Sequence, residues 1–248
     1  MDKVTQYRER LRTLKEWDSF LLKESGLPGP RGNLELVQAV AEEGDEKLFR
    51  RFLAFTPEKA PTNSPYEFLA VCGVVGLGRL VAEGKTKFLE TLRAHASDPR
   101  WRTREGVAMA LQRVGDKDMD SLLDEMERWS KGNPLEKRAA AAALCEPRLL
   151  RRETQVRRVL KILDGITAST LKEENRKSEE FQALRKGLAY CWSVAVAALP
   201  EKGKKAMEKW FQSRDKDIAW IMKENLKKNR LARMDANWVE KWKKKLGN

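Results

Sequence analysis

The sequence predicts an all-α fold, an α-α superhelix in which about six helix pairs stack as a solenoid. Prolines at 65, 99 and 134 each follow a residue that can cap a helix, namely Ser64, Asp98 and Asn133. Such a side chain accepts from the first-turn amides, and proline suits the first helical position because it has no amide to leave unpaired there. The prolines are 34 and 35 residues apart, a spacing typical of helical repeats. Apolar residues recur at three and four positions, and alternating strand-like runs are scarce.

The first helix is expected over residues 4–23, where apolar residues form one stripe. Glycine and proline residues at 26–30 end it, so residues 1–26 are interpreted as an N-terminal capping helix. The helix pairs that follow are expected at 34–43 with 46–55, 66–83 with 85–96, 101–114 with 119–131, 135–145 with 154–164, 179–199 with 203–212, and 217–228 with 237–246.

Three further features complete this interpretation. Glycines at 73, 76 and 78 weaken their own helix, so we expect them to let a neighbouring helix approach closely. The alanine-rich run 139–143 lacks bulk and predicts a central helix with close neighbours on both sides. A polar insert at 165–178 is either a loop or a longer helix, and residues 230–248 are expected to form a basic C-terminal capping helix. Because a repeat array has no internal boundary, residues 1–248 are predicted to form a single domain.

The charge is large and uneven. Lys and Arg number 50 against 37 Asp and Glu, a net charge of +13. Residues 1–60 contain 11 of each sign, whereas residues 200–248 contain 15 basic and 7 acidic residues. This asymmetry favours a polyanionic partner, most often nucleic acid, although lysines that only solvate a helix face remain an alternative.

Several classes of function find no support in the sequence. Cys72, Cys145 and Cys191 are far apart in the chain and match neither a zinc site nor a disulfide framework, and His95 is the one histidine. The apolar stretch 68–78 is too short to cross a membrane, and the charged first residues do not resemble a secretory signal. We therefore expect a cytoplasmic protein with no metal and no cofactor.

Basic residues recur at similar places in the first helix of successive pairs. If these helices line the inner surface of the solenoid, their cations form a stripe along a concave groove that matches a phosphate backbone. The candidate nucleic-acid-binding residues are Arg102, Arg104, Arg138, Arg185, Lys186, Lys223, Lys227 and Lys228. The alternative is that such cations pair with acidic residues of neighbouring repeats, for which Glu105, Glu136, Glu180 and Glu224 are available.

The segment Asp98-Pro-Arg-Trp-Arg-Thr-Arg-Glu-Gly-Val-Ala-Met-Ala-Leu111 resembles the inner helix of a HEAT repeat, and residues 135–144 and 181–192 are similar. Over about residues 65–230 the chain resembles the HEAT-like DNA alkylation repair family, glycosylases that release positively charged alkylpurines from DNA. This resemblance implies a HEAT/ARM-like solenoid with a curved basic groove for duplex DNA.

The resemblance also implies candidate catalytic residues: Trp101, Glu105, Arg138 and Tyr190. Glutamate stands at 105 where the family has aspartate, and tyrosine at 190 where it has tryptophan. Positions i and i+4 place Trp101 and Glu105 on one helix face. There an aromatic ring attracts a cationic base, and a carboxylate stabilises the oxocarbenium character that develops as the glycosidic bond breaks.

Three hypotheses follow. The first is a nucleic-acid-binding solenoid with a basic concave groove, a divergent relative of the alkylation repair proteins that binds duplex DNA or RNA. The second is a scaffold that holds an acidic protein partner in the same groove. The third is a working alkylpurine DNA glycosylase.

Overall fold

The computed structural model describes residues 2–247, and over that range it contains fifteen α-helices, three short 3-10 helices and no strand. The predicted all-α fold is therefore confirmed. The contacts within the chain divide it into two compact units, residues 1–117 (unit 1) and residues 118–248 (unit 2). The single repeat domain expected from the sequence stays a prediction.

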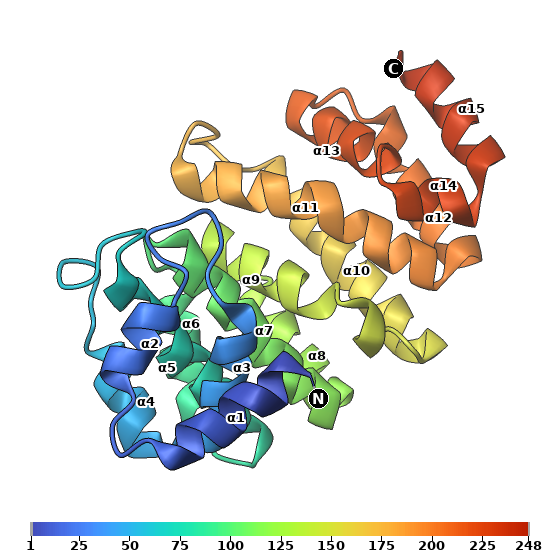
Figure 1. The fold of residues 1–248 in the computed structure, drawn as a ribbon. Coiled ribbons are helices and arrows are strands. Elements are labelled where there is room, and N and C mark those ends of the chain that lie inside the picture. Colours follow the sequence, from blue (N-terminus) through green and yellow to red (C-terminus); the bar gives the residue numbers. More distant parts are fainter. Residues whose placement is uncertain (1, 248) are drawn as a thin grey trace. The chain divides into compact units, whose positions relative to one another are not determined.

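Unit 1 packs its helices in two layers (Figure 1). Its elements are α1 (Lys3–Thr13), α2 (Asp18–Glu24), α3 (Leu34–Glu43), α4 (Glu46–Leu53), α5 (Pro65–Ala82), η1 (Thr86–Phe88), α6 (Leu89–His95) and α7 (Trp101–Lys117). In one layer α1 packs on α3, α3 on α5, and α5 on α7. The other layer holds α4 against α5, and α6 against α5 and α7. This is the solenoid-like arrangement that the repeat spacing predicts.

The core helix of unit 1 is α5, and its glycines allow the close packing expected of them. A Cβ on Gly76 would lie 2.3 Å from ring atoms of Phe49 in α4, and a Cβ on Gly78 would lie 2.4 Å from Cα of Ala110 in α7. Both glycines therefore bring a neighbouring helix nearer than a side chain would permit. The helix that contains the apolar stretch 68–78 is 18 residues long and, by length and composition alone, apolar enough to cross a membrane, but 78% of that window is buried among the other helices.

The N-terminal segment differs from the single helix expected over residues 4–23. Its helix ends at Thr13 and restarts at Asp18. The carbonyl of Leu11 accepts hydrogen bonds from the amide of Leu14 and from Nε1 of Trp17, which close the break. The bend lets Leu11 and Leu21 both be fully buried.

The three proline marks are the pairs of capping residue and proline at 64–65, 98–99 and 133–134, and two of them begin helices as predicted. Ser64 accepts from the amide of Glu67, Asn133 accepts from two first-turn amides, and the following proline is in each case the first helical residue. The capping role predicted for Asp98 was wrong, although α7 does begin at Trp101, where the third helix pair was expected to start. Asp98 instead forms a buried ion pair with Arg100, whose Nη2 lies 2.7 Å from Oδ2.

Unit 2 also has two layers (Figure 1). Its elements are α8 (Met119–Trp129), α9 (Pro134–Leu144), η2 (Pro147–Leu149), α10 (Glu153–Thr170), α11 (Glu179–Ala198), α12 (Pro200–Glu208), η3 (Trp210–Gln212), α13 (Lys216–Leu226), α14 (Asn229–Met234) and α15 (Ala236–Leu246). In one layer α9 packs on α11, α11 on α13, and α13 on α15. In the other layer α10 packs on α8 and α12. The alanine-rich α9 lies against α8, α10 and α11, as expected of a central helix.

Several helix boundaries differ from those expected. The polar insert at 165–178 is partly helical, because α10 continues through Gly165 to Thr170 before the loop. The break expected at Gly115-Asp116 lies instead at Asp118, which caps α8. At the C-terminal end, the short helix α14 precedes the expected capping helix α15. Trp242 of α15 packs on Phe211, with ring centroids 4.5 Å apart.

The three cysteines are buried in helical cores, as expected. Burial raises the pKa of Cys72 well above its usual value. Burial, together with a hydrogen bond to the thiol of Cys191, also raises the pKa of Cys145. These two cysteines are distant in the sequence, and the packing of α9 on α11 brings them together.

Candidate functional site

An apolar cleft of about 420 Å³ lies in unit 1 beside the start of α7. Its described lining residues are Leu27, Pro30, Arg31, Gly32, Leu34, Val37, Phe68, Val71, Trp101, Arg102, Glu105 and Met109. The volume lies within the range of small-molecule pockets, which are mostly apolar with a few placed polar groups. The structure therefore brings together Trp101 and Glu105, the first two candidate catalytic residues.

Trp101 is the aromatic wall of the cleft. Its side chain is 45% exposed, and it is the one tryptophan among the large exposed apolar residues of the described chain. Leu34, at the start of α3, is 49% exposed and lines the same cleft. Exposed apolar side chains that converge on one concavity are typical of a binding site.

Arg102 lines the cleft, and its side chain is buried within unit 1. Its Nη2 donates to the carbonyl of Gly29 at 2.7 Å and to Oδ1 of Asn63 at 3.2 Å. Its Nη1 donates at 3.2 Å to Oε2 of Glu67, a fully buried carboxylate. The guanidinium is buried and lies over the Trp101 ring, with Cζ 4.4 Å from the centroid.

These contacts correct the expectation that Arg102 binds phosphate. Arg102 instead forms an ion pair with an acidic residue of the preceding repeat, which was the alternative expected from the sequence. Its partner is Glu67, which was not among the acidic residues named for that role. Arg104 has similar local bonds, because its Nη1 donates to the carbonyl oxygens of Asp98 and Pro99 at 2.6 and 2.9 Å. Arg102 thus links the start of α7 to the loop at Gly29, and Arg104 holds the backbone just before α7.

The loop between α2 and α3, which forms one wall of the cleft, is fixed by hydrogen bonds to several other segments. Asn33 caps α3 through its Oδ1, while its Nδ2 donates to the Tyr7 hydroxyl and to the carbonyl of Glu24, each at 2.9 Å. The amide of Gly29 donates to Asn63 at 3.0 Å. Arg31 and Leu34 were not among the site residues expected from the sequence, because only the folded loop brings residues 27–37 to residues 101–109. The proline and glycine content of the loop was the one available signal.

In unit 2, Arg185 is a paired cation. Its Nε lies 2.8 Å from Oδ1 of Asp217, and its Cζ lies 3.7 Å from the centroid of the Trp220 ring. Asp217 also pairs with Arg176. Arg185 is therefore partly neutralised within its own unit.

The remaining predicted cations of unit 2 differ in exposure. Lys186 is exposed, and Lys223 and Lys228 are half-buried. None of these three forms an ion pair with a described residue. Lys227 is exposed and pairs with Glu224, one of the acids expected, at 2.5 Å.

Arg138 and Tyr190, the other two candidate catalytic residues, belong to unit 2. A Cβ on Gly187 of α11 would lie 3.2 Å from Cγ of Arg138, so the aliphatic part of the Arg138 side chain packs against α11 at Gly187. Tyr190 follows Gly187 by nearly one turn and is 46% exposed.

Tyr190 also lies beside a second hollow, of about 500 Å³, that contains Arg230 and Arg233. Neither arginine was expected from the sequence to be a site residue, although both extend the basic run that begins at Lys227.

His95 forms a hydrogen bond through Nδ1 with the carbonyl of Thr91 at 2.8 Å, which is a local role at a helix end. Within the described residues no group of three or more His, Cys, Asp or Glu side chains is placed to hold a metal ion. Comparison of the chain with protein-family models and with curated proteins finds no match.

Proposed function

We propose that the protein binds nucleic acid, duplex DNA in the first instance, in the cytoplasm. The observation that carries this proposal is the location of the charge. Residues 118–248 contain 30 Lys and Arg against 20 Asp and Glu, whereas residues 1–117 contain 20 against 17. An excess of positive charge on a single compact unit attracts a polyanion, and contacts with phosphates then supply affinity without reading the sequence.

The cations that support this proposal are those without an acidic partner. Lys186 lies in α11, Lys223 lies in α13 and Lys228 precedes α14, and the charge of each is not balanced by an ion pair with a described residue. Arg138 belongs to the same unit and adds to its positive charge, whereas Arg185 is paired with Asp217 and adds less. Arg102 and Arg104 are used within unit 1, so they are not counted among the expected contacts.

A binding series tests the proposal. The purified, nuclease-treated protein is titrated into labelled duplex DNA, single-stranded DNA and RNA at 50 to 300 mM salt, with polyglutamate of similar charge as the comparison anion. We expect binding to nucleic acid that weakens steeply with salt and exceeds binding to polyglutamate. Equal binding to polyglutamate would favour the acidic protein partner instead, and no binding at low salt would contradict the proposal.

The cleft of unit 1 favours a second candidate function, release of a cationic alkylated purine. An apolar cavity of this size accommodates a base that has left the stack, the Trp101 ring attracts its positive charge, and Glu105 is a carboxylate on the same helix face. The carboxylate would stabilise positive charge that develops on the sugar as the bond to the base breaks. This candidate rests on the resemblance to the alkylation repair family together with the cleft.

A base-release assay tests it with matched variants. DNA that carries a cationic alkylpurine is incubated with the wild type, with Glu105→Gln and with Glu35→Gln. Glu35 is an exposed glutamate of α3 that does not line the cleft. We expect Glu105→Gln to lose release by at least a hundredfold and Glu35→Gln to retain it. Release that Glu105→Gln leaves unchanged removes this residue from the mechanism.

A further inference from the structure

The second hollow, in unit 2, is bordered by three segments that are far apart in the sequence. Pro147 comes from η2 and Tyr190 comes from α11. The third segment follows α13 and provides Lys227 and Lys228, together with Asn229, Arg230 and Arg233 of α14. Four of its lining residues are basic: Lys227, Lys228, Arg230 and Arg233. None of the described residues that line it is acidic.

Most of this positive charge is uncompensated. Lys227 pairs with Glu224, but Lys228, Arg230 and Arg233 form no ion pair with any residue between 2 and 247. Other cations of the same unit are paired: Arg176 with Asp215 and Asp217, Arg158 with Asp124 and Glu127, Lys204 with Asp235, and Lys209 with Asp164. Like charges that share one concavity repel each other, and a bound anion removes that repulsion.

Arg230 forms a hydrogen bond with Tyr190 and lies over its ring, and this contact leaves the charge of Arg230 unneutralised. Nη2 of Arg230 donates to the hydroxyl oxygen of Tyr190, and Cζ lies 4.7 Å from the centroid of the ring. A phenol is neutral, so it orients the guanidinium without neutralising it. The remaining N–H groups of the planar guanidinium match the oxygens of a phosphate, and the half-exposed ring of Tyr190 offers a surface for a sugar or base.

The residues of the hollow are held in place by buried neighbours. Leu231, next to Arg230, is fully buried, and α14 packs on α11. Asn225 links α13 to α11, because its Oδ1 accepts from the amide of Ser193 at 2.8 Å and its Nδ2 donates to the carbonyl of Leu188 at 2.9 Å. Cations fixed in advance lose less conformational entropy when an anion binds.

From this geometry we propose that the hollow between Tyr190 and Arg230 is a phosphate-binding site that accepts a phosphate with its attached nucleoside against Tyr190. The assignment rests on the proposed function, since it names the place where nucleic acid would be anchored. The phosphate comes either from the backbone or from a chain end, and the chemistry of recognition is the same.

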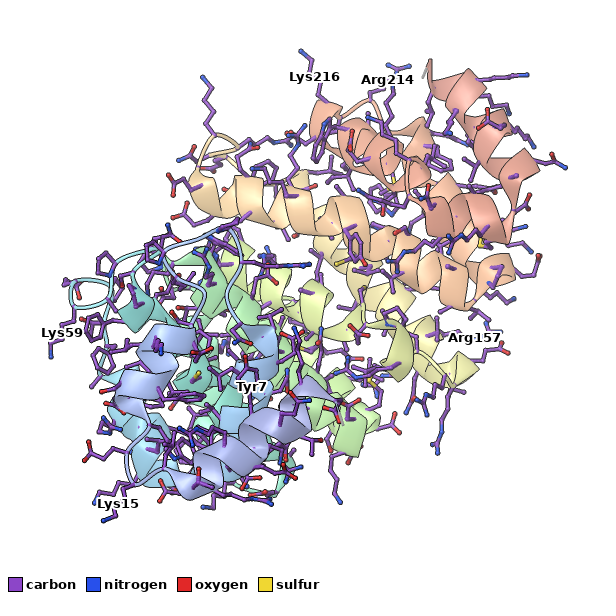
Figure 2. The ribbon with its side chains drawn as sticks, viewed as in Figure 1. Tyr7, Lys15, Lys59, Arg157, Arg214 and Lys216 are labelled. Carbon is purple, nitrogen blue, oxygen red and sulfur yellow. The ribbon has the colours of Figure 1, made fainter. Side chains whose placement is uncertain are left out.

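The first experiment uses the full chain and a small probe. Adenosine 5′-monophosphate and adenosine are titrated into the wild type, Arg230→Gln and Arg214→Gln, with binding followed by NMR. Arg214 is an exposed arginine of the same unit that lies outside the hollow, and Figure 2 shows it and Lys216 pointing away from the helices. We expect the wild type and Arg214→Gln to bind the monophosphate in preference to adenosine. We expect Arg230→Gln to bind it about tenfold more weakly, as for loss of a hydrogen bond to a charged group.

The second experiment uses oligonucleotides with and without a 5′-phosphate. Lys228→Gln is compared with Lys216→Gln, so that each variant loses one lysine charge from the same unit. A loss at Lys228 and Arg230 that depends on the 5′-phosphate identifies a chain end as the source, and an equal loss on both oligonucleotides identifies the backbone. Circular dichroism shows whether each variant keeps its helical content.

The outcomes separate this proposal from the proposed function. If the wild type binds DNA, and Arg230→Gln weakens that binding no more than Arg214→Gln does, the phosphate site is wrong and nucleic-acid binding stands. If the protein binds the monophosphate through Arg230 but binds no nucleic acid, the phosphate site stands and the proposed function fails. Equal binding of adenosine and its monophosphate would overturn the phosphate site directly.

Discussion

Asn225 shows how one buried polar side chain organises the region around Tyr190. The residue is fully buried. Its Oδ1 accepts from the backbone amide of Ser193, and its Nδ2 donates to the carbonyls of Leu188 and Ile221. Ser193 in turn donates from Oγ to the carbonyl of Tyr190 at 2.7 Å. The position of the Tyr190 backbone therefore depends on a side chain one repeat later.

Replacing Asn225 with leucine should destabilise the protein by about 2–3 kcal/mol, because the buried amide of Ser193 loses its acceptor in an apolar environment. The matched control is Asn237→Leu, since Asn237 is exposed on α15. Urea unfolding of both variants measures the difference. Equal midpoints for the two would show that the buried network contributes little.

At the scale of the element, the three proline marks show that one sequence pattern can form two different structures. Ser64 and Asn133 cap helices, whereas Asp98 turns toward Arg100. Nη1 of Arg100 also donates to the carbonyls of Phe55 and Ala60, so the guanidinium closes the loop that precedes α5. A buried arginine two residues after the mark therefore converts a cap into a tertiary contact.

The two roles predict different costs of substitution. Ser64→Ala should cost about 1 kcal/mol, as for a lost helix cap. Asp98→Ala should cost about 3–5 kcal/mol, because it leaves the buried Arg100 without its carboxylate. Denaturant unfolding of the two variants gives both values, and a smaller loss at Asp98 than at Ser64 would contradict the buried ion pair.

Glu46, the first residue of α4, ties that helix to the segment after α5. Hydrogen bonds from Lys85, and further ones from Lys87 and Arg50, lower the pKa of Glu46 to about 2. The Nζ atoms of Lys85 and Lys87 lie 3.1 and 3.3 Å from its carboxylate oxygens. Because the pKa in the folded state is below the ordinary value of 4.5, the ionised carboxylate stabilises the fold above about pH 4.5.

This contribution should disappear as the pH falls from about 4.5 toward 2. Thermal unfolding of the wild type and Glu46→Gln should show a gap in midpoint at pH 7 that narrows at pH 3. Glu35→Gln is the control, since this exposed glutamate should show no such change. A gap that stays constant with pH would argue against the depressed pKa.

At the scale of the whole molecule, the charge is partitioned between the two units. Unit 2 carries the larger excess of positive charge, and within it the hollow at Tyr190 collects cations without acidic partners. Unit 1 is nearly balanced and contains the apolar cleft instead. The two units therefore offer different chemistry, one for anions and one for an apolar or aromatic group.

The salt dependence of DNA binding measures how many of these cations contact phosphates. Each phosphate neutralised contributes about 0.9 to the slope of log affinity against log salt. A triple variant, Lys228→Gln with Arg230→Gln and Arg233→Gln, should reduce that slope by about 2–3, whereas Arg214→Gln with Lys216→Gln should change it by less than 1. Unchanged slopes in the triple variant would place the DNA elsewhere on the protein.

The sequence by itself determined the helical fold, the layout of most helix pairs and the close packing at the α5 glycines. These features depend on local rules, because capping residues, apolar spacing and glycine act within a few turns of their own position. Tertiary structure decided the rest. The break after Thr13, the burial of Arg102 against Glu67, the cleft wall at residues 27–34 and the meeting of Tyr190 with Arg230 all join residues distant in the chain, and a residue's neighbours across the fold are not encoded in its local pattern.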